Sequence, residues 1–312
     1  MFNNYPLLRG ISCLFIPPVM CCFLLVFSSY VQAAPLSATS MEETLTTAGW
    51  TPGTAHRIAE SVAHATGRVV AVFDHDGTLM FGDVTEGEGA HQPGLIREMI
   101  AKGNLTPEGM KQIPDEARLD VWGYYEAFKE RDAIKAYEWL PTLLAGQSLT
   151  ALQEQGRTWY QNVYQRFLFP EMLALLRVFR EAGVEIWIVS ASVEDIVRPA
   201  ASFTGIPAEH ILGIRMKTDG DRILPALARP GSFAAGKVWC IEQFIRPDAS
   251  TTLLTFGDSP RNDGPMLRFA ARSGGVGVLL NPPAEACERF TKAGVLLFTI
   301  PSTQEFRDGK RK

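Results

Sequence analysis

The chain has 312 residues, of which 46% are hydrophobic and 21% are charged, and it contains 27 glycines and 20 prolines. This composition excludes a disordered chain, a collagen-like chain and a membrane protein with many spans. The 30 basic and 34 acidic side chains give a net charge of −4, which excludes a surface built to coat nucleic acid. The length suits one or two domains with a large buried core.

The first apolar segment has the layout of a secretory signal. Residues 11–31 carry no charge, Arg9 precedes them, and the sequence Val31-Gln32-Ala33 places small residues where signal peptidase cleaves. Residues 1–33 are therefore predicted to be a signal peptide, and the mature protein is predicted to be periplasmic or secreted, with no stable membrane partner. The alternative is an uncleaved anchor, because the segment is about long enough to span a bilayer. Two consecutive prolines inside the segment disfavour that alternative.

Few cysteines remain once the predicted signal is removed. Three of the five cysteines lie in that segment, which leaves Cys240 and Cys287. An exported protein can form a disulfide from such a pair, but both cysteines lie in helix-like stretches far apart in the sequence, so two free thiols are an equal alternative. The sequence contains no cluster of cysteines of the kind that binds zinc.

The pattern of apolar runs predicts the fold class. Residues 41–66 are predicted to be helical, with Thr51 and Pro52 as an N-cap and first-turn pair. Residues 68–73 form a continuous apolar run, which suits a strand buried on both faces. Similar runs, separated by helix-like stretches such as 171–181 and 237–245, follow at residues 184–189, 253–256, 276–280 and 295–300. Strands that alternate with helices predict an α/β fold with a Rossmann-like, doubly wound parallel sheet.

Residues 81–168 differ from the rest of the chain. They contain no convincing strand, several helix starts and most of the aromatic residues. We interpret them as a helical cap domain inserted after the first strand, so that the core domain is formed by residues 34–80 and 169–312. Later in the chain, Asp219-Gly220 predicts the turn of a small hairpin with strands at residues 211–216 and 222–224.

Four polar motifs follow predicted strands or open a helix. They are Asp74-His75-Asp76-Gly77-Thr78-Leu79, Ser190, Lys237 and Gly257-Asp258-Ser259-Pro260-Arg261-Asn262-Asp263. The carboxyl ends of the strands in an open α/β sheet meet at one crevice, so we expect these motifs to share a single site. Lys237 opens a helix, where the helix dipole disfavours a cation, and this placement indicates an anion between the lysine and the helix end.

The clustered acids predict a metal-assisted reaction on phosphate. Several neighbouring carboxylates repel one another, and a divalent cation removes that conflict. Mg²⁺ prefers oxygen ligands and is commonly bound by one or two carboxylates together with a phosphate. One aspartate is then free to attack phosphorus and form an aspartyl-phosphate, while a second protonates the leaving oxygen. Ser190 and Lys237 are expected to hold the remaining phosphate oxygens.

These motifs resemble those of the haloacid dehalogenase superfamily. The order and spacing of the motifs agree with that family, with 116 residues from Asp74 to Ser190, 47 from there to Lys237 and 21 from there to Asp258. The long first gap leaves room for a cap, an arrangement similar to the phosphoserine phosphatase branch and to exported phosphorylcholine phosphatases. The resemblance covers residues 68–300.

The resemblance implies a role for each motif residue. Asp74 would be the nucleophile and Asp76 the general acid and base, while Ser190 and Lys237 would bind phosphate. The Mg²⁺ ligands would be Asp74, the backbone carbonyl of Asp76, Asp258 and, through its water molecules, Asp263, with Asn262 in support. Two features depart from the family. His75 stands where an apolar residue is common, and Ser259-Pro260 replaces a glycine-containing turn, which leaves phosphoserine itself uncertain as the substrate.

The aromatic residues of the predicted cap have two interpretations. They can form the packed interior of the cap, or they can enclose a quaternary ammonium group through cation–π attraction. Tyr124 and Tyr125 are predicted to bind substrate, because the pair stands in a similar context in the phosphorylcholine phosphatases. Asp83 and Glu86 can add negative charge near the site, or belong to a solvated loop.

We therefore predict an exported, Mg²⁺-dependent phosphomonoesterase that acts on a small phosphorylated metabolite and not on nucleic acid. One alternative is another chemistry of the same superfamily, a phosphomutase or a dehalogenase; dehalogenation needs neither Asp76 nor the metal-binding acids. The other alternative is a periplasmic binding protein on the same fold. The intact Asp74, Asp76 and Asp258 argue against it, because a binding protein needs no nucleophile or acid.

Overall fold

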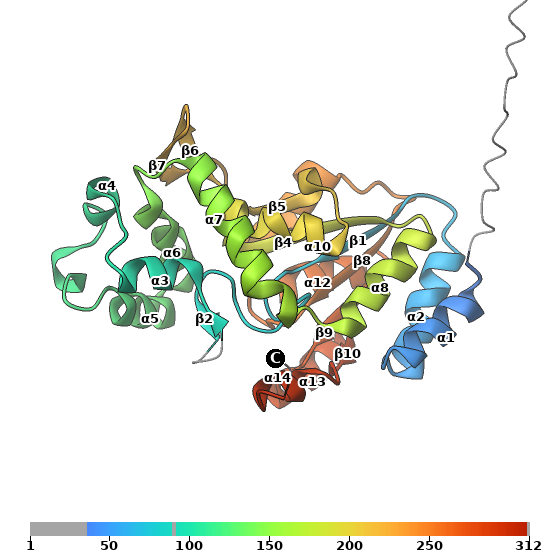
Figure 1. Cartoon of the computed structure of the whole chain (residues 1–312). Helices are drawn as coiled ribbons and strands as arrows, with labels where there is room; N and C mark the ends of the chain where they lie inside the picture. The colour runs from blue at the N-terminus through green and yellow to red at the C-terminus, as the bar shows by residue number, and fades with distance from the viewer. Residues whose placement is uncertain (1–35, 89–91, 311–312) are drawn as a thin grey trace, which may run out of the picture. The chain divides into compact units, whose positions relative to one another are not determined.

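The computed structural model describes residues 36–88 and 92–310 (Figure 1). The predicted signal peptide, and the alternative of an uncleaved anchor, fall on residues 1–33, outside the described part. Within the described ranges, no helix has the length and apolar character needed to cross a membrane.

A six-stranded sheet forms the centre of the fold, and every neighbouring pair of its strands is parallel. Its spatial order is β10 (Leu296–Phe298), β9 (Val276–Leu280), β8 (Thr252–Gly257), β1 (Val69–Phe73), β4 (Glu185–Val193) and β5 (Ile211–Ile214). The first strand of the sheet in chain order, β1, lies in its middle. The later strands are added on one side of β1 and then on the other, which confirms the predicted doubly wound α/β fold.

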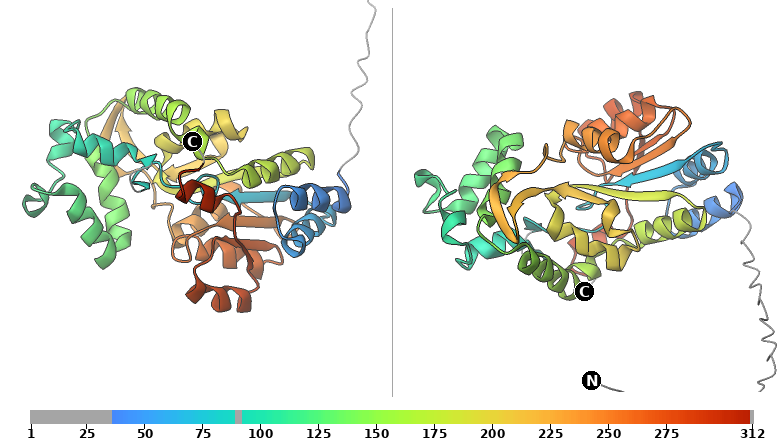
Figure 2. Two further views of the ribbon diagram at one scale, coloured as in Figure 1. Left: turned by 60° about the horizontal axis from the view of Figure 1, so that its bottom comes forward. Right: turned by 90° about the horizontal axis from the view of Figure 1, so that it is seen from above.

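Helices lie on both sides of the sheet (Figure 2). The side chains on both of its faces are buried, which explains the continuous apolar runs. Ala71 and Phe73 of β1 belong to one hydrophobic core, and the alternate residues Val70 and Val72 belong to a second core on the opposite face. The first core includes side chains of α1 (Ala38–Thr47), α2 (Pro52–Ala63) and α8 (Pro170–Glu181). The second includes side chains of α11 (Ala235–Cys240), a π-helical turn (Ile241–Ile245), α12 (Gly264–Arg272) and α13 (Ala284–Lys292).

Several local predictions are confirmed at the level of single residues. Thr51 is the N-cap of α2 and Pro52 is its first residue. The sequence left open whether Cys240 and Cys287 pair, and in the structure both are free thiols, with Cys240 fully buried in the second core and Cys287 half-buried. The remaining helices of the core are α9 (Glu194–Val197), α10 (Ala201–Thr204) and α14 (Thr303–Arg307).

The segment between β1 and α8 is helical, as the sequence predicts. Its helices are α3 (Leu95–Ala101), α4 (Pro107–Met110), α5 (Val121–Arg131), α6 (Ala133–Trp139) and α7 (Leu149–Asn162). A minute antiparallel pair, β2 (Gly87–Glu88) and β3 (Gln92–Pro93), precedes them, although no strand was expected there. The division of the chain into core and cap domains at residues 80 and 168 stays a prediction.

The predicted hairpin is wrong in its first strand. Residues 211–214 form β5, the edge strand of the main sheet, and all four are buried. The antiparallel hairpin instead consists of β6 (Met216–Asp219) and β7 (Arg222–Leu227). The physical reason is burial, because a run such as Ile211-Leu212 needs partners on both faces and finds them beside β4.

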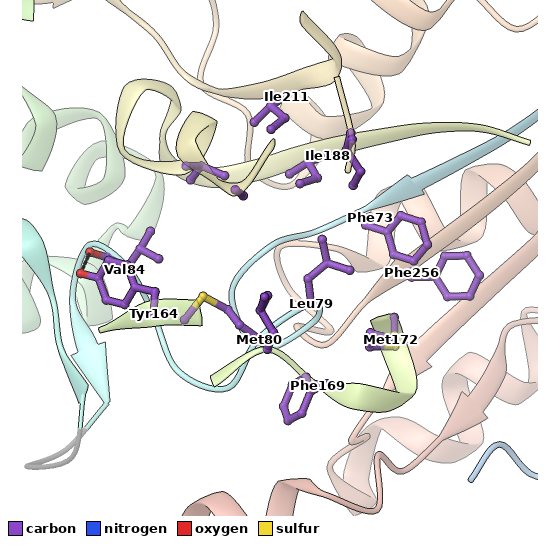
Figure 3. Close-up of a cluster of buried hydrophobic side chains, with 14 of the residues drawn as sticks. Phe73, Leu79, Met80, Val84, Tyr164, Phe169, Met172, Ile188, Ile211 and Phe256 are labelled. Carbon is purple, nitrogen blue, oxygen red and sulfur yellow. Dashed lines mark hydrogen bonds between the residues drawn. The ribbon is translucent and has the colours of Figure 1, made fainter. Parts of the chain in front are cut away.

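Buried side chains anchor the loop that follows β1. Leu79 and Met80 are fully buried and lie near Phe169 and Met172 (Figure 3). At the end of β1, the ring of Phe73 stacks on Phe256 of β8, with centroids 4.6 Å apart. The polar residues 74–78 are therefore held between two apolar anchors at the edge of the sheet.

Candidate active site

The four motifs meet at the carboxyl ends of three neighbouring strands. Asp74 follows β1, Ser190 lies in β4 and Asp258 follows β8, while Lys237 lies in the first turn of α11. A cavity of about 350 Å³ opens at this edge, lined by Asp74, Asp76, Lys237 and Asp258 together with residues of the predicted cap. The expected convergence of distant motifs on one crevice is therefore present.

Three carboxylates form a tight group in this cavity. One oxygen each from Asp74, Asp258 and Asp263 can be chosen so that all three lie within 4.8 Å of one another. Burial, together with repulsion from Asp263, raises the pKa of Asp74 to about 7, although Lys237 opposes the change. Burial and the charges of Asp263 and Asp74 likewise hold the pKa of Asp258 well above its ordinary value. The three acids thus repel one another strongly.

Lys237 lies among these acids and is fully buried. Its Nζ donates to the Asp74 carboxylate and lies 2.6 Å from Oδ1 of Asp263. Burial alone lowers the pKa of a lysine, but Asp263 and Asp74 outweigh it and raise the pKa of Lys237 above its ordinary value. The side chain is therefore a fixed ammonium group directly beside the predicted nucleophile.

Two glycines allow the acids to approach this closely. Gly77 has a φ of +70°, and a methyl group built on it would collide with the Asp258 carboxylate. A methyl group on Gly257 would collide with the Asp263 carboxylate. Glycine has no Cβ, so both positions leave room for the neighbouring carboxylate, and glycine also tolerates the positive φ of Gly77.

The donor set fits Mg²⁺. The grouped ligands of this site, among the residues with described positions, are carboxylate oxygens without histidine or cysteine, and hard oxygen donors select Mg²⁺ over zinc. Burial and, after it, mutual repulsion raise the pKa of Asp74 and Asp258, and a bound divalent cation would remove that repulsion. Asp74, Asp258 and Asp263 are the side chains placed to hold such an ion.

Asp76 lies on the same loop with its carboxylate held by three donors. Oδ1 accepts from the backbone N–H of Val84 at 3.0 Å and lies 3.0 Å from Nδ1 of His75, and Oδ2 accepts from the Ser192 hydroxyl at 2.7 Å. Burial raises the pKa of Asp76, but His75, Ser192 and Val84 together outweigh it and leave the pKa below its ordinary value. Ser192 was not predicted, and strand alternation could not have placed it, because the register of β4 shifts between Val189 and Val193.

Ser190 lies deeper than expected. It is fully buried, its Oγ accepts from the backbone N–H of Ser192 at 3.0 Å, and its carbonyl accepts from Ser232. The residues of β4 that line the cavity are Ala191, Ser192 and Val193. Phosphate binding by the Ser190 hydroxyl stays a prediction.

The two cap tyrosines differ in position. Tyr125 lines the cavity, and its hydroxyl donates to Oε1 of Glu86 at 2.5 Å. Glu86 also forms an ion pair with Lys129, at 2.5 Å. Tyr124 packs instead against Phe128 and Trp139 and is absent from the cavity lining. Helical geometry explains the difference, because successive residues of α5 point about 100° apart. The cavity lining therefore supports Tyr125 and not Tyr124, and substrate binding by either tyrosine stays a prediction.

Other acidic and aromatic residues line the same cavity. Asp83 and Glu86 both line the cavity, so they do not belong to a fully solvated loop. Burial and the charges of Asp76 and Glu86 raise the pKa of Asp83 well above its ordinary value. Tyr137 of α6 lines the cavity, accepts a hydrogen bond from Asn262 at 3.3 Å and stacks near Phe233. No local sequence pattern distinguishes Tyr137 from the other aromatic residues of the segment.

Comparison with known proteins assigns the chain to a family. The pattern of the family described as haloacid dehalogenase-like hydrolase matches residues 71–268, a span that contains all four motifs. The chain belongs to the haloacid dehalogenase-like hydrolases. This confirms the family resemblance, and the expectation of an enzyme, that the motifs support.

Individual relatives of this haloacid dehalogenase-like hydrolase are distant. A phosphorylcholine phosphatase from Pseudomonas aeruginosa is 25% identical over 287 aligned positions, which cover 73% of this chain and 78% of the relative. Protein CicA from Caulobacter vibrioides is 27% identical over 207 positions, covering 66% of this chain and 85% of the relative. A solved structure of a protein of unknown function from Bordetella pertussis Tohama I shares the fold, with a TM-score of 0.59, 20% identity and coverage of 75% of this chain and 99% of that one.

Proposed function

We propose that this hydrolase is a Mg²⁺-dependent phosphatase that cleaves a small phosphomonoester through an aspartyl-phosphate on Asp74. The observation that carries the proposal is the Asp74 carboxylate, which faces the cavity with Lys237 in contact and Asp258 and Asp263 beside it. The family assignment and the relative named phosphorylcholine phosphatase support it.

The residues divide the reaction between them. Bound Mg²⁺ would neutralise the acids and the phosphate oxygens, which lets an anionic nucleophile approach an anionic substrate. An oxygen of Asp74 attacks phosphorus, the bond from phosphorus to the leaving oxygen breaks, and Asp76 gives its proton to that oxygen. In the second half, Asp76 removes a proton from a water molecule that attacks phosphorus, which releases phosphate and restores Asp74. Lys237 keeps a positive charge beside Asp74 throughout.

We further propose that the leaving group carries an amino or ammonium group. The cavity that holds the metal-binding acids is also lined by Tyr125, Asp83, Glu86 and Glu88. Aromatic faces and carboxylates both attract a cation in a partly desolvated site. Lys129 already pairs with Glu86, so Asp83 and Glu88 are the acids placed to meet a cationic group.

A substrate panel tests the proposal. Release of phosphate from phosphorylcholine, phosphoserine, phosphoethanolamine, glycerol 2-phosphate and p-nitrophenyl phosphate is measured with Mg²⁺ and with excess chelator. We expect turnover that depends on Mg²⁺ and favours the esters of amino alcohols. Turnover in chelator would exclude the metal site. Release of halide from a haloacid, or transfer of phosphate within a sugar phosphate, would favour the alternative chemistries, and binding without turnover would favour a binding protein.

We also propose that the protein is exported and acts in the periplasm or outside the cell. The proposal rests on the charge-free segment of residues 11–31 and on the small residues that end it. Mass spectrometry of the protein recovered from cell fractions tests it. A mature chain that begins at Ala34 in the periplasm or medium supports the proposal, and a full-length chain in the membrane fraction supports the anchor.

A further inference from the structure

His75 is fully buried between the predicted acid and the predicted cap, and both of its ring nitrogens have partners. Nδ1 lies 3.0 Å from Oδ1 of Asp76, and Nε2 lies 2.9 Å from the hydroxyl of Tyr160. Tyr160 belongs to α7 and is itself fully buried, with its ring stacked on Phe203. The three side chains therefore form a continuous hydrogen-bonded chain from α7 to Asp76.

The direction of the hydrogen bonds follows from the chemistry of the partners. Once Asp76 has given up its proton, its carboxylate only accepts hydrogen bonds, so Nδ1 of His75 then carries the hydrogen that faces Asp76. In the neutral ring, Nε2 is then an acceptor and receives the hydroxyl hydrogen of Tyr160. Burial, with the nearby charge of Asp76, raises the pKa of Tyr160, so its hydroxyl stays protonated and supplies that hydrogen.

The chain restrains how the Asp76 carboxyl can turn. Oδ2 accepts from Ser192, and Oδ1 is held by His75 and by the backbone N–H of Val84. Without the imidazole, Oδ1 would keep only the second of these two contacts, the hydrogen bond from the backbone N–H of Val84. An apolar side chain at position 75 can fill the space but cannot bind a carboxylate, and a histidine buried there without partners would be costly.

We propose that His75 and Tyr160 are positioning residues that orient the carboxyl of Asp76 toward the leaving oxygen and couple this orientation to α7. The inference rests on the proposed phosphatase function, in which Asp76 gives its proton to that oxygen. It predicts that loss of either residue lowers kcat/KM most for the substrates whose leaving group depends most on being protonated.

Leaving-group dependence separates this role from simple packing. An alkoxide leaves poorly unless it is protonated, whereas p-nitrophenolate leaves readily without a proton. The ratio kcat/KM reports the steps up to loss of the leaving group, so it excludes the later hydrolysis of the aspartyl-phosphate. The experiment compares kcat/KM for p-nitrophenyl phosphate with that for the alkyl phosphate that the substrate panel identifies as best, in each variant.

Four variants make the comparison. His75→Leu removes the donor to Asp76, and His75→Asn restores an amide donor close to the position of Nδ1. Tyr160→Phe removes only the hydroxyl. Tyr164→Phe is the matched control, because the Tyr164 hydroxyl is buried nearby but donates to the carbonyl of Val84, which also accepts from the backbone N–H of Leu95 (Figure 3).

We expect His75→Leu to lower kcat/KM for the alkyl ester at least about tenfold more than for p-nitrophenyl phosphate, which is part of the roughly 10²–10⁴-fold that general acid catalysis contributes. In His75→Asn this difference should be partly abolished, and in Tyr160→Phe it should be present but smaller. In Tyr164→Phe the ratio of kcat/KM for the two substrates should stay unchanged.

Equal losses for both esters in His75→Leu and Tyr160→Phe would overturn the inference but not the proposed phosphatase function. If His75→Leu does not fold, Tyr160→Phe decides. Absence of turnover with every ester in the unmodified protein would overturn the proposed function, and the inference with it.

Discussion

Gly77 and Asp258 come from different motifs, and they approach so closely that no side chain fits between them. A methyl group on Gly77 would overlap the carboxylate of Asp258, and the φ of +70° at Gly77 already disfavours any residue with a Cβ. The loop after β1 and the loop after β8 are therefore fitted to each other at the candidate metal site.

The first prediction concerns this contact. Gly77→Ala should weaken Mg²⁺ binding and activity at least about tenfold, because the methyl group displaces Asp258 from the other two acids. Gly103→Ala is the matched control, since Gly103 has a φ of +67° but no atom near the position of a Cβ. Both variants should lose roughly 1 kcal/mol or more of stability from the backbone strain. Calorimetric titration with Mg²⁺ should separate them, and equal affinities would contradict the proposed role of Gly77.

The second prediction tests the nucleophile. Asp74→Asn should abolish turnover, because an amide is a poor nucleophile and a poor metal ligand, while the nearly isosteric change preserves the fold. Asp195→Asn makes the same substitution at a buried aspartate outside the cavity lining, bonded to Gln153, and should keep turnover. Beryllofluoride should form an adduct at residue 74 in the unmodified protein alone. More than a small residual activity in Asp74→Asn would exclude an aspartyl-phosphate.

The third prediction uses stability to detect the metal. Mg²⁺ at about 100 times its Kd should stabilise the unmodified protein by about 2.7 kcal/mol, which appears as a higher Tm. Asp258→Ala removes one of three repelling carboxylates. The Tm of this variant should therefore be high in chelator and should not rise when Mg²⁺ is added. Thermal melts of both proteins, with Mg²⁺ and with chelator, provide the measurement. An identical response to Mg²⁺ in the variant would show that Asp258 is not a ligand.

The fourth prediction concerns the leaving group. Tyr125→Leu should raise the KM for phosphorylcholine several-fold, because each aromatic face around an ammonium group contributes about 0.5–2 kcal/mol. The KM for p-nitrophenyl phosphate should change little. Tyr124→Leu is the matched control at the neighbouring position outside the cavity lining. Equal losses for both substrates, accompanied by a lower Tm, would instead support packing within the cap as the role of Tyr125.

The fifth prediction is a pH dependence of stability at the opposite end of β1. Arg68 donates from Nε and Nη2 to the two carboxylate oxygens of Glu185, at 2.7 and 2.6 Å. The hydrogen bonds from Arg68 outweigh burial and lower the pKa of Glu185 below its ordinary value of 4.5. The stabilisation is therefore present above pH 4.5 and is lost as the pH falls through the lower pKa of the folded state.

Glu185→Gln tests this linkage. At pH 7 the variant should be less stable by about 0.5 kcal/mol, a value kept small because the pair is partly exposed and screened by solvent. The difference from the unmodified protein should shrink as the pH falls below 4.5 and vanish once the pH lies below the pKa that Glu185 has in the folded protein. Glu288→Gln, at an exposed pair with Lys292, is the control and should show no such trend. Denaturant unfolding across this pH range is the measurement, and a difference that grows toward acid would reverse the assigned sign.

Much of the fold was predictable from local pattern. Apolar runs ending in Asp74, Ser190 and Asp258 indicate strands buried on both faces, and parallel strands bring their carboxyl ends to one edge regardless of what lies between them. The same residues predict the chemistry of the candidate site, because clustered acids attract a cation and a lysine attracts an anion. The sequence by itself therefore determined the sheet apart from its edge strand β5, the motifs and the family.

Only the tertiary structure decided which side chains complete the site. Tyr124 and Tyr125 are equivalent in sequence, and only the packing of α5 turns Tyr125 toward the cavity. The polar partners of His75 are invisible in the sequence, because Tyr160 lies 85 residues away on a helix whose docking depends on many weak contacts. Residues 211–214 lie in the main sheet and not in the hairpin, because an apolar strand pairs where both of its faces can be buried. Periodicity determines which face of an element is buried, and the partner of that face depends on contacts between segments far apart in the chain.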